Sequence, residues 1–292
     1  MCAFEGLILK GVGGFYTVQP DDDAEPVVCR PRGRFRLDGI RPLPGDRVTC
    51  SRAPDGMGRI EAIHPRRNVF ARPPVANMDA LILVVSQAVP KSDPWLIDRM
   101  TVLAEREGLR VIICVNKIDL HPARELVDIY DKTGYPTLCV SARTGEGIPA
   151  LLRVAAGQTA VFAGNSGVGK SSLLNCLCPG LALETAEVSL KGGRGRHTTR
   201  HVELIPMGAH AYVTDTPGFS AFEPERAESP RPEAFQALFP EINPFEGACR
   251  FTGCLHLGAE GCAVWAAAAR GDIAASRFEN YKRMVRECKG DY

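Results

Sequence analysis

The feature that most constrains this chain is a glycine-rich loop between an apolar run and a helix-forming segment. The apolar run covers residues 160–163, the helix-forming segment covers residues 170–177, and the loop reads Gly164-Asn165-Ser166-Gly167-Val168-Gly169-Lys170-Ser171. This is the pattern G-x-x-x-x-G-K-[ST] in the setting that it requires, after a strand and before a helix. Glycines let backbone N–H groups approach a phosphate, and the helix N-terminus adds a favourable dipole. The segment therefore predicts a nucleotide-binding fold of the α/β class, built on a parallel sheet.

The polar residues of this loop have predicted roles in holding a nucleotide. Lys170 is expected to reach the β- and γ-phosphates, and the hydroxyl of Ser171 to hold Mg²⁺. The backbone of residues 164–169 would surround the phosphates, and the site extends to Ser172 on the first turn of the helix.

A second motif, Asn116-Lys117-Ile118-Asp119, has the form of a loop that reads guanine. A carboxylate such as that of Asp119 accepts two hydrogen bonds from guanine N1–H and N2–H₂, which adenine cannot supply. A P-loop ATPase is the alternative for the glycine-rich loop, and Asp119 disfavours it. The guanine motif precedes the phosphate loop in this chain, whereas an ordinary GTPase has the two in the opposite order.

Two further elements complete the candidate site. Ser141-Ala142 follows a predicted strand and can offer backbone N–H groups to guanine O6. Asp215-Thr216-Pro217-Gly218 also follows a strand, where Asp215 can hold Mg²⁺ through water and the N–H of Gly218 can sense the γ-phosphate. Each short motif is weak alone, because turns of this composition are common. All four elements lie at the carboxyl ends of predicted parallel strands, and together they predict a guanine-nucleotide site.

Three regions follow one another along the chain. Residues 1–68 predict a small β-barrel such as an OB-fold, with strands at residues 7–10, 15–18, 27–29, 33–36, 46–50 and 58–63. Residues 69–222 alternate strands with crossover helices. The strands are predicted at residues 80–86, 110–115, 137–140, 160–163, 202–207 and 211–214, and the helices at residues 94–108, 122–132, 148–154 and 170–177. Residues 223–292 are irregular and proline-rich, with helices predicted at residues 263–270 and 277–287.

Composition excludes several classes of protein. No apolar run reaches the length of a membrane span, and the N-terminus lacks the pattern of a signal peptide. Eleven cysteines are an odd number in a long chain, which favours reduced thiols in the cytoplasm over a secreted disulfide framework. Eight of them are predicted to be free thiols, with those in strands in the core: Cys2, Cys29, Cys50, Cys114, Cys139, Cys176, Cys178 and Cys288.

A net charge of +1 hides a basic stretch between residues 30 and 72. Arginine forks suit phosphate and guanine edges, so this stretch is compatible with a face that binds nucleic acid. A solvated basic surface is the alternative, and charge alone favours it. The residues concerned are Arg30, Arg32, Arg34, Arg36, Arg41, Arg47, Arg52, Arg59, Arg66, Arg67 and Arg72.

The remaining three cysteines stand close to a histidine in the C-terminal region, in the pattern Cys249-x₄-Cys254-x-His256-x₅-Cys262. Three thiolates and an imidazole are the ligand set of a closed tetrahedral Zn²⁺ site, and small irregular modules often need such an ion to fold. The spacing differs from that of a common C-x₂-C finger, so unligated thiols are the alternative. With four protein ligands, the metal would be structural rather than catalytic.

With these motifs in this order, the chain resembles the ribosome small-subunit-dependent GTPase A family of bacteria, whose GTPase domain is circularly permuted. The resemblance covers nearly the whole chain, from the barrel to the cysteine-rich tail, and the cysteine–histidine spacing matches the family pattern. It implies that Gly195-Arg196-His197-Thr198-Thr199 is switch I, in which Thr198 or Thr199 contacts Mg²⁺ and the γ-phosphate of bound GTP. A mobile basic loop is the plainer interpretation of residues 191–200, and it is compatible with the switch role.

The residue after Gly218 bears on catalysis. It is Phe219, where many regulatory GTPases carry a glutamine that orients the attacking water, and a phenyl ring cannot do this. Slow intrinsic hydrolysis is therefore expected, with His197 or a group from a partner positioning the water. Alternatively, His197 only packs or binds phosphate. The residues expected to act in hydrolysis are Lys170, Asp215, Thr199 and His197, and Mg²⁺ is expected on Ser171, Thr199 and Asp215.

The resemblance implies a cytoplasmic, monomeric GTPase that binds GTP, GDP, the small ribosomal subunit and its 16S rRNA. It would act late in assembly of the subunit, which would stimulate hydrolysis. The alternative is an RNA-binding module in which the nucleotide tunes affinity and hydrolysis is incidental. Basic residues of the tail either assist in gripping rRNA or form a solvated helix face: Arg277, Lys282, Arg283, Arg286 and Lys289.

The order of the motifs also predicts a coupling route. Residues 215–218, which are expected to sense the γ-phosphate, lead directly out of the GTPase domain towards the C-terminal module. Loss of the γ-phosphate is therefore expected to reorient that module.

Overall fold

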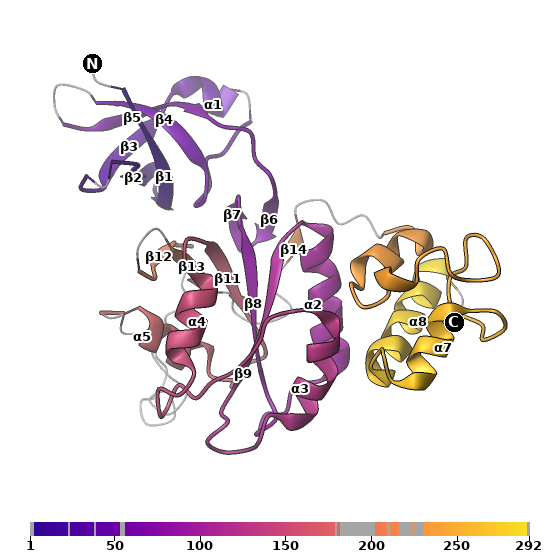
Figure 1. The fold of residues 1–292 in the computed structure, drawn as a ribbon. Helices are drawn as coiled ribbons and strands as arrows, with labels where there is room; N and C mark the ends of the chain where they lie inside the picture. Colours follow the sequence, from indigo (N-terminus) through magenta and orange to yellow (C-terminus); the bar gives the residue numbers. More distant parts are fainter. Residues whose placement is uncertain are drawn as a thin grey trace.

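The computed structural model describes residues 3–22, 24–37, 39–52, 56–178, 180–181, 202–208, 211–215, 223–224 and 230–290. Figure 1 shows three regions: an N-terminal barrel, a central sheet flanked by helices, and a C-terminal helical module. The predicted fold class is confirmed in all three. Among the described helices, none combines the length and the apolar character that a membrane span requires.

The N-terminal region is a closed five-stranded barrel with the strand order β1-β2-β3-β5-β4. The strands are β1 (Ala3–Val12), β2 (Phe15–Pro20), β3 (Val27–Pro31), β4 (Arg47–Arg52) and β5 (Gly58–Ile63). The strand predicted at residues 33–36 is wrong, because this segment is the short helix α1 (Gly33–Leu37). Strand β5 lies between β3 and β4, so the chain must cross an end of the barrel here, and α1 does so with Phe35 in the barrel core.

Strand β1 attaches the barrel to the central domain. Its side chains alternate, so Leu7 and Leu9 point away from the barrel core that Ile8 enters, and its register against β2 shifts between Ile8 and Lys10. Ile8 packs in the barrel core, whereas Leu9 packs in the core of the central sheet. The carbonyl of Leu9 accepts a hydrogen bond from the N–H of Leu204 (2.8 Å), and Lys10 Nζ lies 2.6 Å from Glu203 Oε2.

The central sheet has the strand order β10-β9-β8-β11-β13-β12, and all its pairs are parallel except that of β12. Its strands are β8 (Ala80–Ser86), β9 (Arg110–Asn116), β10 (Thr137–Cys139), β11 (Thr159–Ala163), β12 (Ile205–Pro206) and β13 (Tyr212–Asp215). The strand predicted at residues 202–207 is shorter than expected, because only residues 205 and 206 pair along β13.

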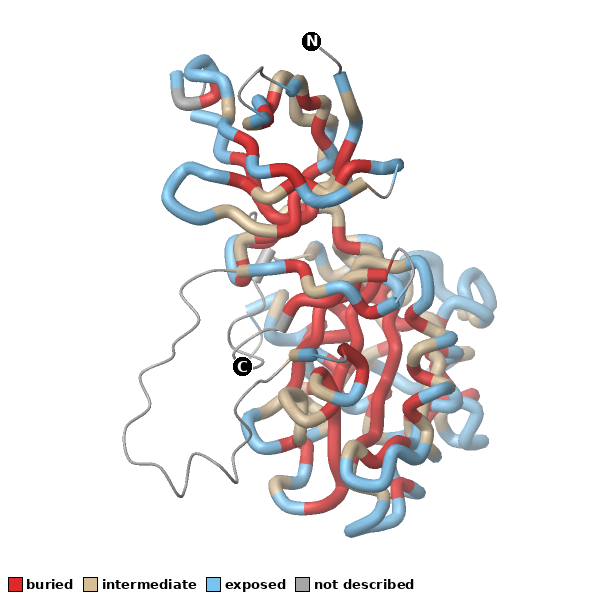
Figure 2. The backbone as a smooth tube through the Cα atoms, turned by 90° about the vertical axis from the view of Figure 1, so that its left-hand side faces the viewer, coloured by how far each residue is buried: buried red, intermediate tan, exposed pale blue. Residues whose placement is uncertain are grey.

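Helices cover both faces of this sheet (Figure 1). One face packs on α2 (Pro94–Arg106) and α3 (Arg124–Tyr130), and the other on α4 (Ile148–Ala155) and α5 (Lys170–Leu177). Alternate residues of β8 therefore enter different cores: Leu81 and Leu83 face α2, and Ile82 and Val84 face α5. Burial on both faces explains why β8 is an unbroken apolar run (Figure 2).

A small sheet β14-β6-β7 lies beside the barrel end of the central domain. It contains β6 (Val69–Arg72), β7 (Pro74–Ala76) and β14 (Glu223–Pro224). Because β14 pairs antiparallel with β6, the chain is held against the start of the central domain before it reaches the C-terminal module.

The C-terminal module contains the 3-10 helices η3 (Pro232–Leu238) and η4 (Asn243–Phe245) and the helices α7 (Ala263–Arg270) and α8 (Ala275–Lys289). Its own apolar core includes Phe235, Phe239, Val264, Phe278 and Val285. Val102 of α2 belongs to the same cluster, and Figure 1 shows the module beside α2.

Two basic residues of α8 are buried, although the sequence predicted an exposed position for them. Arg277 is fully buried and Lys282 is 5% exposed, so the choice between an rRNA grip and a solvated helix face is wrong for both. Arg277 pairs with Asp98 and Glu241, and Lys282 lies over the ring of Trp265. The other three basic residues of the tail are exposed: Arg283, Arg286 and Lys289.

The predicted core cysteines are mostly confirmed. Cys29, Cys50 and Cys114 are buried free thiols in strands. Cys139 is also in a strand but is exposed, and here the prediction is wrong. It is the last residue of β10, which lies beside β9 at the edge of the sheet as far as the chain is described.

Candidate functional site

The phosphate loop connects β11 to α5 and is packed against the neighbouring strands. A Cβ atom on Gly164 would lie 2.2 Å from the carbonyl oxygen of Val84, and one on Gly169 would lie 2.3 Å from Asn116 Nδ2. Only glycine fits at these two positions, because a methyl group on Gly164 would collide with Val84 and one on Gly169 would collide with Asn116. Lys170 Nζ donates hydrogen bonds to the carbonyl oxygens of Gly164 (2.8 Å) and Asn165 (3.1 Å), which places the amine over the loop.

The side chain of Asn116 joins the phosphate loop to the loop at residues 141–142. Its Nδ2 donates to the carbonyl oxygen of Val168 (2.9 Å), and its Oδ1 accepts from the N–H of Ala142 (3.1 Å). Asn116 is 3% exposed. One buried amide thus holds together two loops that lie 52 and 26 residues away from it along the chain.

The carboxylate of Asp119 is oriented by its neighbours. The hydroxyl of Ser141 donates to Asp119 Oδ1 (2.7 Å), and the guanidinium of Arg143 lies 3.9 Å from Oδ2. Ile118 packs on the core of the α2 face. Lys117 adopts a left-handed backbone conformation (φ 65°), and its Nζ donates to the carbonyl oxygen of Val89 (3.0 Å). The guanine motif is therefore assembled around a fixed carboxylate.

Both backbone N–H groups of the 141–142 pair are engaged within the protein. Ser141 donates to the carbonyl of Glu146 (2.9 Å), and Ala142 donates to Asn116. Contact of guanine O6 with the Ala142 amide therefore requires that its bond to Asn116 be shared or exchanged.

The remaining predicted residues of the site are placed only in part. The backbone of Asp215 ends β13 opposite Phe162 of β11, so it lies next to the strand that enters the phosphate loop. Ser171 and Ser172 occupy the first turn of α5 and are half-buried. His197, Thr198, Thr199, Gly218 and Phe219 lie outside the described residues.

The loop between β8 and α2, residues 87–92, also borders the site and was not predicted from the sequence. Besides the contact of Val89 with Lys117, Pro90 faces the phosphate loop, because a Cβ on Gly167 would lie 3.2 Å from its ring. The segment carries no recognisable motif. Its position after the carboxyl end of a parallel strand was the one available signal, since ligands of α/β sheets bind at that edge.

The cysteine–histidine cluster of the C-terminal module is assembled as predicted. The candidate ligand atoms of Cys249, Cys254, His256 and Cys262 all lie within 4.8 Å of one another. Cys249 Sγ lies 3.9 Å from Cys262 Sγ, and His256 Nδ1 lies 3.6 Å from the first sulfur and 3.4 Å from the second. Tetrahedral Zn²⁺ with bonds of about 2.3 Å to sulfur and about 2.0 Å to nitrogen sets such separations at about 3.5–3.8 Å.

Backbone and side-chain groups around the cluster also suit a metal. Backbone N–H groups of Ala263, Trp265 and His256 donate to the three sulfurs, which stabilises thiolates. The second ring nitrogen of His256 lies 3.0 Å from Gln236 Oε1, an arrangement that orients the imidazole. Burial lowers the pKa of His256, which favours the neutral form that binds metal. The cluster is therefore compatible with a structural zinc ion.

Comparison with known proteins gives matches over nearly the whole chain. Residues 63–225 match the family model described as RsgA GTPase, and residues 5–60 match the model of the RsgA N-terminal domain. A relative from Moorella thermoacetica, named small ribosomal subunit biogenesis GTPase RsgA, is 44% identical over 97% of this chain and 97% of its own length. A relative of the same name from Bacillus anthracis is 42% identical over 98% and 97% of the two chains.

Two solved structures are similar to the whole chain. The crystal structure of YjeQ from Thermotoga maritima superimposes with a TM-score of 0.82 at 35% identity and covers 99% of each chain. The structure of YloQ, described as a circularly permuted GTPase, gives a TM-score of 0.82 at 34% identity and covers 100% of this chain and 96% of its own.

Replacing Asn116 with alanine should weaken nucleotide binding. Asn116→Ala removes two hydrogen bonds that together contribute about 1–3 kcal/mol, so the Kd for GDP should rise by about 5–150-fold. Titration calorimetry with GDP measures the change. Asn243→Ala, at an exposed asparagine of the C-terminal module, is the matched control and should leave the Kd unchanged. An unaltered Kd in the Asn116 variant would show that the two loops do not depend on this amide.

Removing one ligand of the cluster should remove the zinc. The purified chain should contain one zinc ion, and Cys262→Ser should contain much less, because a closed site needs all four ligands. Metal analysis of the purified proteins measures this content. Cys288→Ser, a thiol of the same module outside the cluster, should keep its zinc. A zinc-free wild-type protein, or full zinc in the Cys262 variant, would contradict the assignment.

Proposed function

This chain belongs to the RsgA GTPase family, and on that premise we propose that it acts in the biogenesis of the small ribosomal subunit. Membership makes it a GTP-hydrolysing enzyme with a circularly permuted domain. The observation that carries the proposal is the bridge made by Asn116, because it joins the guanine loop to a glycine loop that can hold phosphates. An RNA-binding module with incidental hydrolysis is not favoured.

The described residues have specific tasks in binding GTP. Ser141 holds the Asp119 carboxylate where it can accept hydrogen bonds from guanine N1–H and N2–H₂. Lys170 exchanges its bonds to the loop carbonyls for the β- and γ-phosphate oxygens. The GTPase family implies Mg²⁺ with GTP, and this ion supplies positive charge against the charge that develops on the phosphate. We assign Ser171, Asp215 and Thr199 to hold it.

The C-terminal cluster is proposed to hold one Zn²⁺ per chain with a structural role. Four protein ligands leave no open coordination position, so the ion fixes the fold of the module and takes no part in hydrolysis. The described chain between η4 and α7 forms no helix or strand that would hold its shape, which is the setting in which such an ion is needed.

The proposed partner is the small ribosomal subunit, contacted through its 16S rRNA by a monomeric protein in the cytoplasm. Four arginines of the basic stretch are already neutralised by carboxylates: Arg32, Arg47, Arg66 and Arg67. Arg30 and Arg52 are exposed and lie over the rings of Phe15 and Phe4, at 4.4 and 5.5 Å. Flat guanidinium–aromatic pairs on a basic surface suit unstacked RNA bases and phosphates.

The test of the function is GTP turnover with purified ribosomal subunits. A group supplied in trans is worth about 10³–10⁵ in turnover where it completes a GTPase site, so we expect small subunits to accelerate hydrolysis by more than about tenfold. Large ribosomal subunits are the matched control and should have no such effect. Equal turnover with and without small subunits would favour the RNA-binding module instead.

His197 is proposed to position the attacking water in place of the glutamine that Phe219 replaces. His197→Ala should lower turnover in the presence of small subunits by about 10²–10⁴-fold, the usual contribution of a general base, and leave GTP affinity unchanged. His121→Ala, at an exposed histidine outside the proposed machinery, should keep full turnover. A His197 variant with normal stimulated turnover would refute the role.

A further inference from the structure

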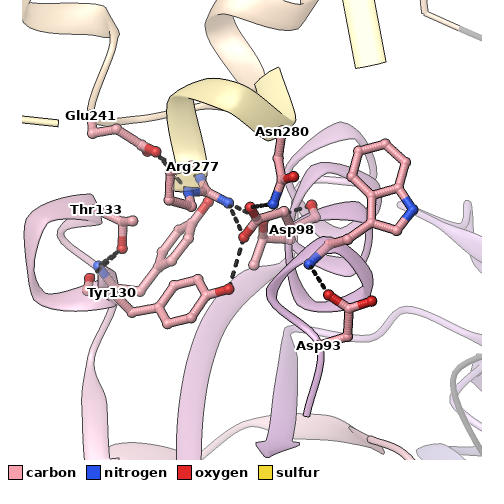
Figure 3. Close-up of polar contacts among 10 residues, drawn as sticks. Asp93, Asp98, Tyr130, Thr133, Glu241, Arg277 and Asn280 are labelled. Carbon is pink, nitrogen blue, oxygen red and sulfur yellow. Dashed lines mark hydrogen bonds and ion pairs between the residues drawn. The ribbon is translucent and has the colours of Figure 1, made fainter. Parts of the chain in front are cut away.

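The contact between α8 and α2 is centred on a buried arginine, Arg277 (Figure 3). Its Nη1 donates to Asp98 Oδ1 (2.9 Å) and to Thr101 Oγ1 (3.0 Å), both on α2. Its Nε and Nη2 donate to the two carboxylate oxygens of Glu241 (2.7 and 3.1 Å), and its guanidinium lies 4.4 Å from the ring centre of Phe239. Arg277 thus connects the GTPase domain to the C-terminal module through one side chain.

Asp98 is the matching centre on the GTPase domain. It accepts hydrogen bonds from the hydroxyl of Tyr130 at the end of α3 (2.8 Å) and from Asn280 Nδ2 of α8 (2.6 Å). Burial raises the pKa of Asp98, while the bonds to Arg277, Asn280 and Tyr130 act in the opposite direction. The side chains of Asp98 and Arg277 are both 0% exposed, so neither charge is shared with solvent.

A buried ionic contact of this kind fixes the orientation of the two domains more than it stabilises their association. Desolvation of the charges offsets most of their attraction, but removing one partner leaves the other unpaired in the interior. Two surface contacts fix the orientation further: the guanidinium of Arg283 lies 3.8 Å from the ring centre of Trp95, and Lys132 Nζ donates to the carbonyl of Gly271 (2.7 Å). The module is therefore docked on α2 in one defined position.

The other end of α2 lies at the nucleotide site. Its preceding loop, residues 87–92, accepts the Lys117 hydrogen bond at Val89 and places Pro90 against the phosphate loop. Gln87 and Lys91 of the same loop contact Glu125 in the first turn of α3. Asp98 lies five residues beyond the N-cap of α2, about 7.5 Å along the helix axis. A shift of this loop would therefore reach Asp98 through less than two turns of helix.

We propose that α2 couples the nucleotide site to the C-terminal module, with Arg277 and Asp98 as positioning residues. The alternative route runs along the chain from residue 215 to residue 230. The middle of that connection, β14, is paired with β6, so a displacement that starts at residue 215 would be stopped at β6 before it reached the C-terminal module. The α2 contact bypasses this anchor. The inference rests on the proposed guanine-nucleotide site.

The coupling can be measured without ribosomes, because linkage is reciprocal. If the bound nucleotide biases how the module docks on α2, then loosening the docking must change the relative affinities for the two nucleotides by the same factor. Titration calorimetry on the full, zinc-loaded chain gives the Kd values for GDP and for a non-hydrolysable GTP analogue. In Arg277→Met we expect the ratio of these Kd values to change by at least about fivefold.

Arg286→Met, on the exposed side of α8, is the matched control and should keep the wild-type ratio. Asn280→Ala keeps both charges and removes one bond to Asp98; it should change the ratio in the same direction by a smaller factor. This variant decides the question if Arg277→Met loses its zinc or fails to fold. An unchanged ratio in a zinc-loaded variant, or equal weakening of both nucleotides, would overturn the proposal and leave a purely structural contact.

This outcome is separate from that of the proposed function. A failure of small subunits to stimulate turnover would not alter the ratio measured here. An unchanged ratio in a protein that subunits do stimulate would reject only the route through α2.

Discussion

The parallel pairing of β8 with both β9 and β11 is the constraint on which the rest of the molecule depends. It places the strand that ends in Asn116 and the strand that enters the phosphate loop on either side of one central strand. The carboxyl ends of all three then meet at one edge, which is where the side chain of Asn116 spans from Val168 to Ala142. The reversed order of the motifs does not disturb this edge, because strand neighbours in the sheet are independent of chain order.

Circular permutation changes which regions of the chain flank the sheet. The first strand of the central sheet, β8, now follows the barrel in the chain, and the barrel is fixed to the central domain by Leu9 of β1, which packs in the core of that sheet. The carbonyl oxygen of Leu9 accepts a hydrogen bond from the N–H of Leu204, a residue that follows the proposed switch I in the chain. The same permutation brings α2, the first helix of the domain, next to α8, the last helix of the chain. The barrel therefore lies against the amino ends of the central strands, beside Asp79, Thr159 and Tyr212, whereas the C-terminal module contacts the helix that follows a loop of the nucleotide site.

Local patterns predicted much of this arrangement, and the errors have physical reasons. Two sites were identified by spacing alone: the glycine loop at residues 164–171 and the cysteine–histidine cluster. In each of them, all the residues that define the motif lie within one short segment of the chain. The task of Asn116 was not visible, because its partners are distant in sequence. The segment at residues 33–36 has alternating polarity but no free strand edge to join, so barrel topology made it a helix. The alternation of β1 places Leu9 on the outer face of the barrel, but the core that it enters there could not be predicted, because its partners are distant in sequence.

Arg277 shows why charge patterns on helices mislead. Its neighbours in α8 include several exposed basic residues, so periodicity alone gives it a solvated face. What buries it is a carboxylate 179 residues away on α2 and a second one on the segment between η3 and η4. An apolar residue at this position would bury as well but would not select one orientation, whereas a guanidinium shared by two fixed carboxylates does. The C-terminal module must hold a defined position on the GTPase domain, and the single orientation selected by Arg277 is a physical reason to retain a buried charge there. The same contact makes α2 the element through which the module is held.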